Sequence, residues 1–495
     1  MGALCALACV ALLAPGAAEA RRSRPPVVLM VFDEFPSTDL FGKHGRIDGR
    51  RFPNFARLAG DATWYRHATT ASDTTFTAVP SILEGRVHRY RPGRPPRIGG
   101  NILSFLAGHG YRVHARAEAR GVCQRRFCGR QHTTRYYLVR SRLARLNDFI
   151  DSIQPSKRPT IWFKHVLLPH LPWIYLPSGK QYIRGYRPPL RGINSARGVF
   201  DPGLENLSYQ RHLFQVMALD RAVGRLIDHL KKTGLYNKAL VVVVADHGIS
   251  FRVGETDKRI VTRANVQGIA PVPLFIKRPR QTRGRVSDLF VRNSDVAPSI
   301  AHFLGLSLPW HTSGHPVTSR LVRRRHTVHV QSRLPGVSAI QLGVGSFVSR
   351  WRRRIRSTHG IFGIGSVPRA FAIGPARRVI GRQVTGLRIA RAGRVRASVL
   401  GASEIRQVNR RSRFIPSLVS GYIRGGRGRH RRALAIVVNG RIVATGRSFY
   451  LRGSSRESYA VIVPDSSFQP GRNSVRVLAV GRRGKRLRFR ALGRV

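Results

Sequence analysis

Two continuous apolar runs constrain the fold of this 495-residue chain more than any other feature. They are VVLMVF at residues 27–32 and LVVVVA at residues 240–245. Each has the length of a strand, and a strand that is apolar at every position must be covered on both faces. Between the runs lies an amphipathic segment, residues 209–232, whose apolar side chains recur with helical spacing. This alternation predicts an α/β fold with a mostly parallel central sheet and helices on both faces.

Further segments continue this alternation up to about residue 320. Strands are expected at 63–67, 111–116, 159–165 and 272–277, and helices at 52–61, 101–109 and 295–305. After residue 320 helical patterns fade, and residues 433–446 and 458–465 resemble strands, with Asn439-Gly440 as a strong hairpin signal. We therefore expect an α/β domain over residues 21–320 and a smaller, basic, β-rich domain over 396–495. Residues 321–395 stay unassigned, as a candidate completion of the first domain.

The N-terminal residues 1–20 are almost uniformly apolar, end in Ala-Glu-Ala and are followed by two arginines. This pattern is typical of a secretory signal peptide or of a membrane anchor, so we expect an extracytoplasmic protein, secreted or membrane-anchored. Beyond this segment the only cysteines are Cys123 and Cys128. In an oxidising compartment they favour a disulfide. A zinc site completed by His132, or two free thiols, are the alternatives.

The charge of the chain is strongly unbalanced. It has 88 Lys and Arg against 23 Asp and Glu, a net charge of +65, and residues 321–495 contain only three of the acids. Such a balance excludes an ordinary near-neutral cytosolic enzyme and favours anionic partners. Nucleic acid, an anionic membrane surface and a cell-wall polymer all fit, and so does an arginine-rich composition without a dedicated ligand. Because carboxylates are scarce, those at the ends of buried strands need an explanation.

Acidic residues follow both apolar runs. Asp33-Glu34 comes after the first run and Asp246-His247 after the second. In open α/β sheets ligands bind beyond the carboxyl ends of the strands. Carboxylates suit hard divalent cations, and histidine suits zinc or manganese. Turn or capping roles are the alternatives at each position, but the two pairs together predict a metal site.

A hydroxyl-rich segment supplies a third element. Residues 72–85 read SDTTFTAVPSILEG, and Ser72 or Asp73 can cap a helix that starts just after it. The free N–H groups at such a helix start favour an anion. A hydroxyl held there against a metal ion can lose its proton and attack phosphorus or sulfur. A plain cap ahead of a core helix is the alternative.

The order of these motifs resembles the alkaline phosphatase/sulfatase superfamily over about residues 25–310. The matching segments are VLMVFDE, FPNFARLA, the threonine segment with a glycine ten residues later, PHLPW, VVVVADHG, VPLFIKRP and RNSDVAPSIAHFLGL. The resemblance implies one divalent metal ion, with Mn, Ca, Zn and Mg not distinguished. It implies these metal ligands: Asp33, Glu34, Thr75, Asp246 and His247. Thr75 would also be the nucleophile, and His170 would contact the transferred group. Lys164 and His165 are weaker candidates for the same cleft.

Departures from the family pattern shape the expected activity. Formylglycine sulfatases carry Cys or Ser, then Pro and Arg, at the nucleophile, whereas this chain reads Thr75-Phe76-Thr77-Ala78-Val79. The threonine resembles phosphodiesterases and lipid phosphoglycerol or phosphoethanolamine transferases of the superfamily. Glu34 replaces the usual second aspartate. No second ligand set has convincing spacing, and Asp220 and His315 are better explained by a helix surface and a loop.

The expected function is therefore an exported, metal-dependent hydrolase or transferase that acts on phosphoesters through a covalent threonine intermediate. Sulfate-ester hydrolysis is a second enzymatic alternative. The substrate would be an anionic small molecule or a lipid head group, and an anionic membrane surface or cell-wall polymer is a candidate partner. The alternative from another class is a non-enzymatic basic protein of the cell surface or one that binds nucleic acid. The export segment and the lack of recognition motifs argue against nucleic acid.

Overall fold

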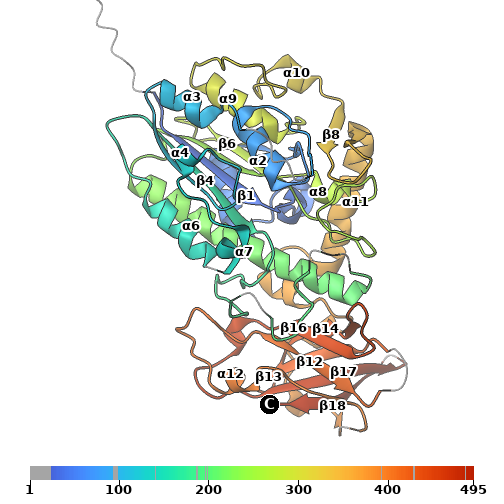
Figure 1. Cartoon of the computed structure of the whole chain (residues 1–495). Helices are drawn as coiled ribbons and strands as arrows, with labels where there is room; N and C mark the ends of the chain where they lie inside the picture. The colour runs from blue at the N-terminus through green and yellow to red at the C-terminus, as the bar shows by residue number, and fades with distance from the viewer. Residues whose placement is uncertain are drawn as a thin grey trace, which may run out of the picture.

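The computed structural model describes residues 24–495 apart from 93–97, 140, 186–187, 196, 198, 392, 427–429 and 485. The expected signal peptide or anchor at residues 1–20 lies outside the described residues. Figure 1 shows a larger α/β part and, beside one end of it, a smaller part built from strands. Within the part of the chain that the structure describes, none of the helices is both long and apolar enough to cross a membrane.

A seven-stranded sheet forms the centre of the larger part, with the strand order β3-β4-β1-β5-β6-β2-β7. The strands are β1 (Val27–Asp33), β2 (Thr63–Tyr65), β3 (Arg112–Ala117), β4 (Thr160–Pro169), β5 (Leu240–Ala245), β6 (Leu274–Lys277) and β7 (Arg285–Ser287). Strands β3, β4, β1 and β5 are parallel, and β6 runs antiparallel to β5 and β2. The predicted mostly parallel sheet is confirmed. Every residue of β1 and β5 is buried.

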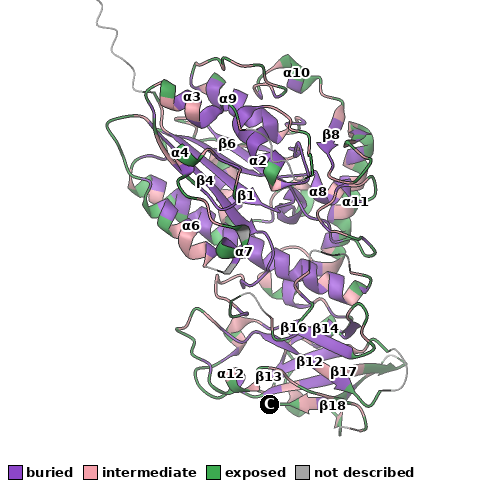
Figure 2. Cartoon of the chain, viewed as in Figure 1, coloured by how far each residue is buried: buried purple, intermediate pink, exposed green. Residues whose placement is uncertain are grey.

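Helices cover both faces of this sheet. They are α1 (Pro53–Asp61), α2 (Thr75–Glu84), α3 (Ile102–Gly108), α4 (Arg125–Cys128), α5 (Thr134–Val139), α6 (Arg142–Asp151), α7 (Pro202–Lys232), α8 (Val266–Ile269), α9 (Val296–Phe303) and α10 (Arg320–Arg323). Short 3-10 turns lie at Ser37–Leu40, Lys43–Gly45 and Asn293–Asp295. Helices α1, α6 and α7 pack together on one face, and α2, α3 and α9 pack on the other (Figure 1). Figure 2 shows the buried residues concentrated in the sheet and on the inner faces of these helices.

The structure gives definite roles to Asp220 and to the cysteine pair. Asp220 on α7 is buried and accepts hydrogen bonds from the N–H groups of Asn54 and Phe55, at 3.1 and 2.8 Å. It therefore caps the first turn of α1, and its expected place on a helix surface is wrong. Cys123 and Cys128 form a disulfide, the first of the three alternatives for this pair.

Residues 321–371 add a hairpin and a long helix to the larger part. Strands β8 (Thr327–Gln331) and β9 (Ala339–Gly343) lead into α11 (Val344–Phe362), and a 3-10 turn follows at Val367–Phe371. The ring of Trp351 meets Phe41 edge-on at 4.7 Å. The expected loss of helical pattern after residue 320 is wrong for α11. Its buried residues Phe347, Trp351, Ile355 and Phe362 do recur with helical spacing, but arginines between them mask the pattern.

The smaller part consists of two sheets that share a core. Its elements are β10 (Ile389–Ala390), β11 (Arg396–Ala397), α12 (Ala402–Arg406), β12 (Leu418–Arg424), β13 (Ala433–Val438), β14 (Arg441–Arg447), β15 (Phe449–Tyr450), β16 (Glu457–Ile462), β17 (Val475–Arg483) and β18 (Arg486–Arg494). Three 3-10 turns lie at Arg377–Val379, Val384–Gly386 and Asp465–Ser467. The sheet orders are β10-β18-β17-β13-β14 and β11-β12-β16-β15. Asn439 and Gly440 both have positive φ, at 48° and 81°, in the predicted hairpin turn between β13 and β14.

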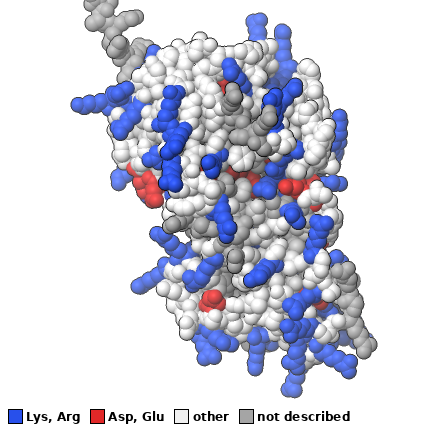
Figure 3. All heavy atoms as spheres, viewed as in Figure 1, with Lys and Arg blue, Asp and Glu red and all other residues white. Residues whose placement is uncertain are grey.

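The positive charge covers both parts of the molecule. Figure 3 shows Lys and Arg side chains over the whole visible face, with few acidic groups among them. In the β17–β18 hairpin, Arg483 lies directly opposite Arg486, an arrangement in which like charges repel. Among the described residues, an ion pair between Arg431 Nε and Asp201 Oδ2, at 2.6 Å, joins the two parts.

Candidate active site

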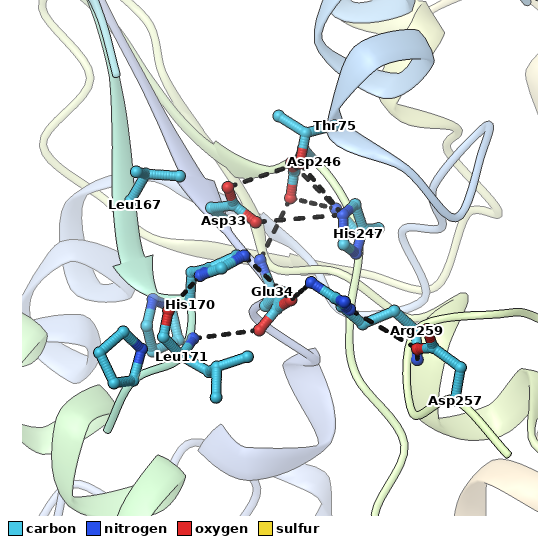
Figure 4. Close-up of polar contacts among 12 residues, drawn as sticks. Asp33, Glu34, Thr75, Leu167, His170, Leu171, Asp246, His247, Asp257 and Arg259 are labelled. Carbon is cyan, nitrogen blue, oxygen red and sulfur yellow. Dashed lines mark hydrogen bonds and ion pairs between the residues drawn. The ribbon is translucent and has the colours of Figure 1, made fainter. Parts of the chain in front are cut away.

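Two neighbouring strands bring the acidic motifs together. Because β1 and β5 are adjacent and parallel, Asp33 at the end of β1 lies next to Asp246, the residue that follows β5. The N–H group of Glu34 donates to Asp246 Oδ1 at 3.3 Å. Figure 4 shows Asp33, Asp246 and His247 gathered below Thr75. We expected this convergence from the sequence, because both acidic pairs directly follow predicted strands.

Thr75 is the first residue of α2, and its hydroxyl faces the acidic cluster. Its Oγ1 lies 3.3 Å from His247 Nε2 and 3.4 Å from Asp33 Oδ2. Among the described residues, no hydrogen bond engages the N–H groups of Thr75 and Phe76, and Phe76 beside it is 41% exposed. A helix start with free N–H groups favours an anion. The hydroxyl thus lies where a bound anionic group would meet it.

Among the described residues, no Lys or Arg forms an ion pair with the buried carboxylates of Asp33 and Asp246. Burial, followed by the charges of Asp246 and Glu34, holds the pKa of Asp33 well above its ordinary value. Burial likewise raises the pKa of Asp246. Within the described chain, Asp33 Oδ1, Glu34 Oε1 and Asp246 Oδ2 are buried oxygens without a hydrogen-bond partner. Because orphaned buried oxygens are costly, this set fits a cation.

The histidines direct nitrogen lone pairs into the same space. His247 Nδ1 donates to Gly248 O at 2.9 Å, so in the neutral ring Nε2 carries the lone pair. That nitrogen lies 3.7 Å from Asp246 Oδ2 and 4.0 Å from Asp33 Oδ1. His165 Nε2 lies 3.7 Å from Asp33 Oδ2, and burial lowers the pKa of His165 to about 3. Converging oxygen and nitrogen donors of this kind form a set that could hold a divalent metal ion.

The carboxylate of Glu34 contacts His170, Arg259 and the N–H of Leu171. Its backbone has a positive φ of 60°, and its Oε2 accepts a hydrogen bond from the N–H of Leu171 at 3.2 Å. Its Oε1 lies 3.3 Å from His170 Nε2 and 3.7 Å from Arg259 Nη1. Burial raises the pKa of Glu34, but His170 and Arg259 outweigh this and lower it. Figure 4 shows this carboxylate below the Asp33–Asp246 cluster.

The donor atoms form two overlapping groups. One contains Asp33, His165 and Asp246, and the other contains Asp33, Glu34 and His170, with the donor atoms of each group within 4.8 Å of one another. Asp33 belongs to both. Among the described residues, no ion pair or side-chain hydrogen bond joins the Glu34 carboxylate to Asp246 or His247. The structure therefore brings all the expected ligands to one region but orients Glu34 toward His170.

A fully buried arginine holds the turn that carries His170. The guanidinium of Arg142 donates to three main-chain oxygens, those of Leu167 at 2.7 Å, His170 at 2.5 Å and Pro172 at 2.5 Å. His170 Nδ1 faces the carbonyl oxygen of Leu171, which leaves Nε2 directed at Glu34. Burial lowers the pKa of His170 to about 4, so its ring is neutral near pH 7.

We expect Arg142→Met to lower the free energy of unfolding by about 3 kcal/mol or more, because three buried carbonyl groups lose a charged donor and that of His170 keeps only the bond from Gln215 Nε2. Turnover should fall as well, since the turn that positions His170 loosens. Urea unfolding and steady-state kinetics check both effects. Arg221→Met, at an exposed arginine of α7, is the matched control and should change stability by less than about 1 kcal/mol. Equal losses in the two variants would contradict this role.

Among the described residues, Lys164 forms an ion pair with Glu118 and with no residue of the acidic cluster. Its Nζ lies 2.8 Å from Glu118 Oε1, and Glu118 also accepts from Arg145 Nε at 3.0 Å and from the N–H of Leu167 at 3.1 Å. Burial raises the pKa of Glu118, but Lys164 and Arg145 outweigh it and lower the pKa to about 2. The weaker candidate Lys164 is thus part of a buried ion-pair network beside the site.

This network predicts a pH dependence of stability. Because the pKa of Glu118 is depressed in the folded state, its contribution to the stability of the fold is fully present above its ordinary value of 4.5 and is lost as the pH falls toward about 2. The shift corresponds to about 3 kcal/mol. Urea unfolding between pH 7 and pH 3 should show the stability difference between the wild type and Glu118→Gln shrinking at acid pH. Glu404→Gln, at a partly exposed carboxylate, should show no comparable trend. A difference that grows at acid pH would refute this reasoning.

Nothing in the sequence singles out three charged residues that lie near the site, namely Asp257, Arg259 and Arg333. Arg259 reaches Glu34, and Asp257 lies 3.6 Å from Arg259 Nε and 3.8 Å from Arg333 Nη2. Arginines are too frequent in this chain for any one of them to be singled out by pattern. His315 lies elsewhere, where its N–H donates to Asp295 Oδ1.

Comparisons with known proteins find similarity over the part of the chain that contains this site. A family model described as Sulfatase matches residues 25–306. The chain is 31% identical over 102 residues to N-acetylglucosamine-6-O-sulfatase of Bacteroides thetaiotaomicron, covering 20% of this chain and 17% of that protein. It is 31% identical over 94 residues to lipoteichoic acid synthase 2 of Bacillus subtilis, covering 18% of this chain and 14% of that protein. The chain therefore spans only a minor part of the length of these curated relatives.

Among solved structures, a phosphonate monoester hydrolase from Silicibacter pomeroyi is similar with a TM-score of 0.47 and 16% identity. The match covers 64% of this chain and 81% of that one. A protein solved in complex with its substrate D-glucosamine-2-N,6-O-disulfate is similar with a TM-score of 0.49 and 12% identity, over 68% of this chain and 98% of that one.

Proposed function

Because the chain belongs to the sulfatase family, whose members are hydrolytic enzymes, we propose that it is a metal-dependent hydrolase or transferase of phosphoesters that works through a covalent Thr75 intermediate. The observation that carries the proposal is the Thr75 hydroxyl, which lies at the start of α2 within 3.4 Å of Asp33 and His247. Family membership also sets aside the alternative of a non-enzymatic basic binding protein.

The residue at position 75 separates phosphoester from sulfate-ester chemistry. A formylglycine nucleophile arises from Cys or Ser, and Thr75 is neither. An unmodified threonine that takes up a sulfuryl group forms an intermediate that is hard to discharge without the hydrated aldehyde. A phosphothreonine intermediate is discharged by direct attack of water or an alcohol on phosphorus. This difference supports phosphoester transfer.

The chemistry proceeds in two displacements. Thr75 Oγ1 attacks phosphorus, the bond from phosphorus to the leaving oxygen breaks, and the leaving oxygen takes up the proton that Thr75 loses. Water in hydrolysis, or an alcohol in transfer, then attacks the same phosphorus. The bond to Thr75 Oγ1 breaks, and Thr75 recovers a proton from the incoming group. His170 is neutral near pH 7, so its Nε2 can accept a hydrogen bond from the attacking water or alcohol.

The residues that would hold one divalent ion are Asp33, Asp246, His247 and Thr75, with Glu34 and His165 at the edge of the set. When bound, such an ion supplies positive charge that lowers the pKa of a nearby hydroxyl and stabilises charge on the transferred group. The orphaned carboxylate oxygens support this assignment. Mixed oxygen and nitrogen donors are compatible with Mn and Zn, and the carboxylates are also compatible with Ca and Mg.

The proposed activity is tested by elemental analysis of the purified protein together with a substrate panel. We expect one divalent ion per chain and turnover of an aryl phosphodiester at least about tenfold above that of the matching aryl sulfate, a difference of about 1.4 kcal/mol in the barrier. A preference for the sulfate ester would overturn the assignment. It would favour the second candidate, sulfate-ester hydrolysis by unmodified Thr75, which the names of the sulfatase relatives support.

We also propose that the enzyme works outside the cytoplasm and close to anionic molecules. The apolar segment 3–20 supports an extracytoplasmic location, and the surface cations in Figure 3 support anionic substrates, lipid head groups or cell-wall polymers near the protein. Binding to vesicles should then rise with the fraction of anionic lipid and fall with salt. Vesicle binding that ignores both variables would contradict an anionic surface as partner.

A further inference from the structure

A segment far along the chain borders the nucleophile. The N–H of Gln331 donates to Ala71 O at 2.9 Å, and the N–H of Asp73 donates to Gln331 O at 3.2 Å. Asp73 Oδ2 in turn accepts from the N–H groups of Val261 at 2.9 Å and Arg333 at 3.3 Å. Residues 331–333 and the loop around residue 261 are thereby fixed against Asp73, two residues before Thr75.

These two segments carry arginines that share one carboxylate. Arg259 Nε lies 3.6 Å from Asp257 Oδ1, and Arg333 Nη2 lies 3.8 Å from the same oxygen. Arg259 also lies 3.7 Å from Glu34 Oε1, so within the triad of Arg259, Asp257 and Arg333 it is Arg333 that has only the shared Asp257 as an ion-pair partner among the described residues. The side chains of Arg259 and Arg333 are 27% and 22% exposed, and they are therefore accessible to a ligand.

The donor capacity of the two arginines is not used up. Arg259 Nε and both Nε and Nη2 of Arg333 are buried atoms that have no hydrogen-bond partner in the part of the chain that the structure describes. A guanidinium forms its strongest hydrogen bonds with planar or tetrahedral anions. Two of them held together with unused donors form a site that an anion would complete.

The triad lies beside the reacting centre and not on it. Figure 4 shows Arg259 between Glu34 and Asp257, with Asp257 at the end that lies farther from Thr75. The group attacked by Thr75 would lie over Asp33 and His247, which contact the hydroxyl. An anion bound at the Asp257 end of the triad would therefore be distinct from the group that Thr75 attacks.

We propose that Arg259 and Arg333 form an anion-binding subsite for a second negatively charged group of the substrate, separate from the group transferred to Thr75. The ligand chemistry is a phosphate, sulfate or carboxylate carried on the organic part of the ester. The inference rests on the proposed function for its substrate and deepens it, because it restricts the substrates to esters that carry two anionic groups.

The test uses two aryl phosphodiesters that differ only in a second anion, methyl phenyl phosphate and methyl 4-carboxyphenyl phosphate. The wild type should have a KM about tenfold lower for the carboxylated ester, as expected for one charge-assisted hydrogen bond. Arg333→Gln should bring the two KM values to within about twofold of each other. Arg324→Gln, which removes an exposed arginine from the same region of the chain, should keep the wild-type ratio.

Three results would overturn the subsite. They are a wild-type enzyme without preference, an Arg333→Gln variant that raises both KM values by the same factor, and an Arg324→Gln variant that loses the preference equally. Binding of phenylphosphonate and 4-carboxyphenylphosphonate to Thr75→Ala, measured by calorimetry with and without Arg333→Gln, needs no turnover. A carboxylate preference there that depends on Arg333 would support the subsite even if the phosphodiesters are not turned over. Equal binding of the two phosphonates would refute it independently of the reaction.

Discussion

Thr75→Ala should lower kcat for an aryl phosphodiester by about 10⁴-fold or more, as removal of a covalent nucleophile does in other enzymes. The alanine has no oxygen to attack phosphorus, while Asp33, Asp246 and His247 keep their positions, since none of them depends on Thr75 for its backbone hydrogen bonds. Steady-state kinetics on metal-analysed protein measures the loss. Rapid quenching of the wild type should yield a phosphorylated peptide that contains Thr75.

Thr75→Ser is the conservative control for this result. It keeps a hydroxyl at the start of α2 and should retain substantial turnover, whereas Thr75→Val keeps the shape and should be as inactive as the alanine variant. A threonine that served only to cap α2 or to fill space would give the opposite order. Wild-type turnover in Thr75→Ala would remove the covalent mechanism altogether.

Asp33→Asn should abolish metal binding, because Asp33 belongs to both groups of donor atoms. In the wild type a saturating divalent ion should raise the free energy of unfolding by about 2.7 kcal/mol at a hundredfold excess over Kd. In Asp33→Asn this increment should disappear. Without metal the variant should be at least as stable as the wild type, since it removes one of three buried carboxylates that repel each other. Thermal unfolding with and without metal measures both effects.

Asp228→Asn is the matched control for this prediction. Its carboxylate is 65% exposed and pairs only with Arg57 among the described residues, so its metal-induced stabilisation should equal that of the wild type. If Asp33→Asn retained the full metal-induced increment, the donor set would have to be sought elsewhere. If the metal-free variant were strongly destabilised, Asp33 would be a structural residue instead of an uncompensated charge.

Much of the α/β core was predictable from local pattern. The apolar runs at 27–32 and 240–245 became β1 and β5, since buried parallel strands leave this signature. Helix α7 begins at Pro202, earlier than the expected residue 209, because its first turn is capped by Asp201. Helix α11 was not predicted, because arginines lie between its apolar residues and obscure their helical spacing.

The convergence of the candidate site residues was predictable from the sequence, but the orientation of their side chains was not. Parallel strands end at the same edge of a sheet, so Asp33 and Asp246 had to be neighbours. The direction of the Glu34 carboxylate was not predictable, because it depends on a left-handed backbone conformation and on the N–H of Leu171. Arg142 and Arg333 act through contacts with residues at least 25 positions away in the chain, which no local pattern encodes.

The sequence by itself determined the α/β core and the acidic residues at the ends of its central strands, because strand burial and the residues that follow a strand are local properties of the sequence. Only the tertiary structure decided which of the many arginines lie near Thr75 and how the carboxylates face one another. Those facts depend on contacts between segments such as 71–73, 257–261 and 331–333, and such contacts are fixed by packing of the whole core and not by the residues on either side of them.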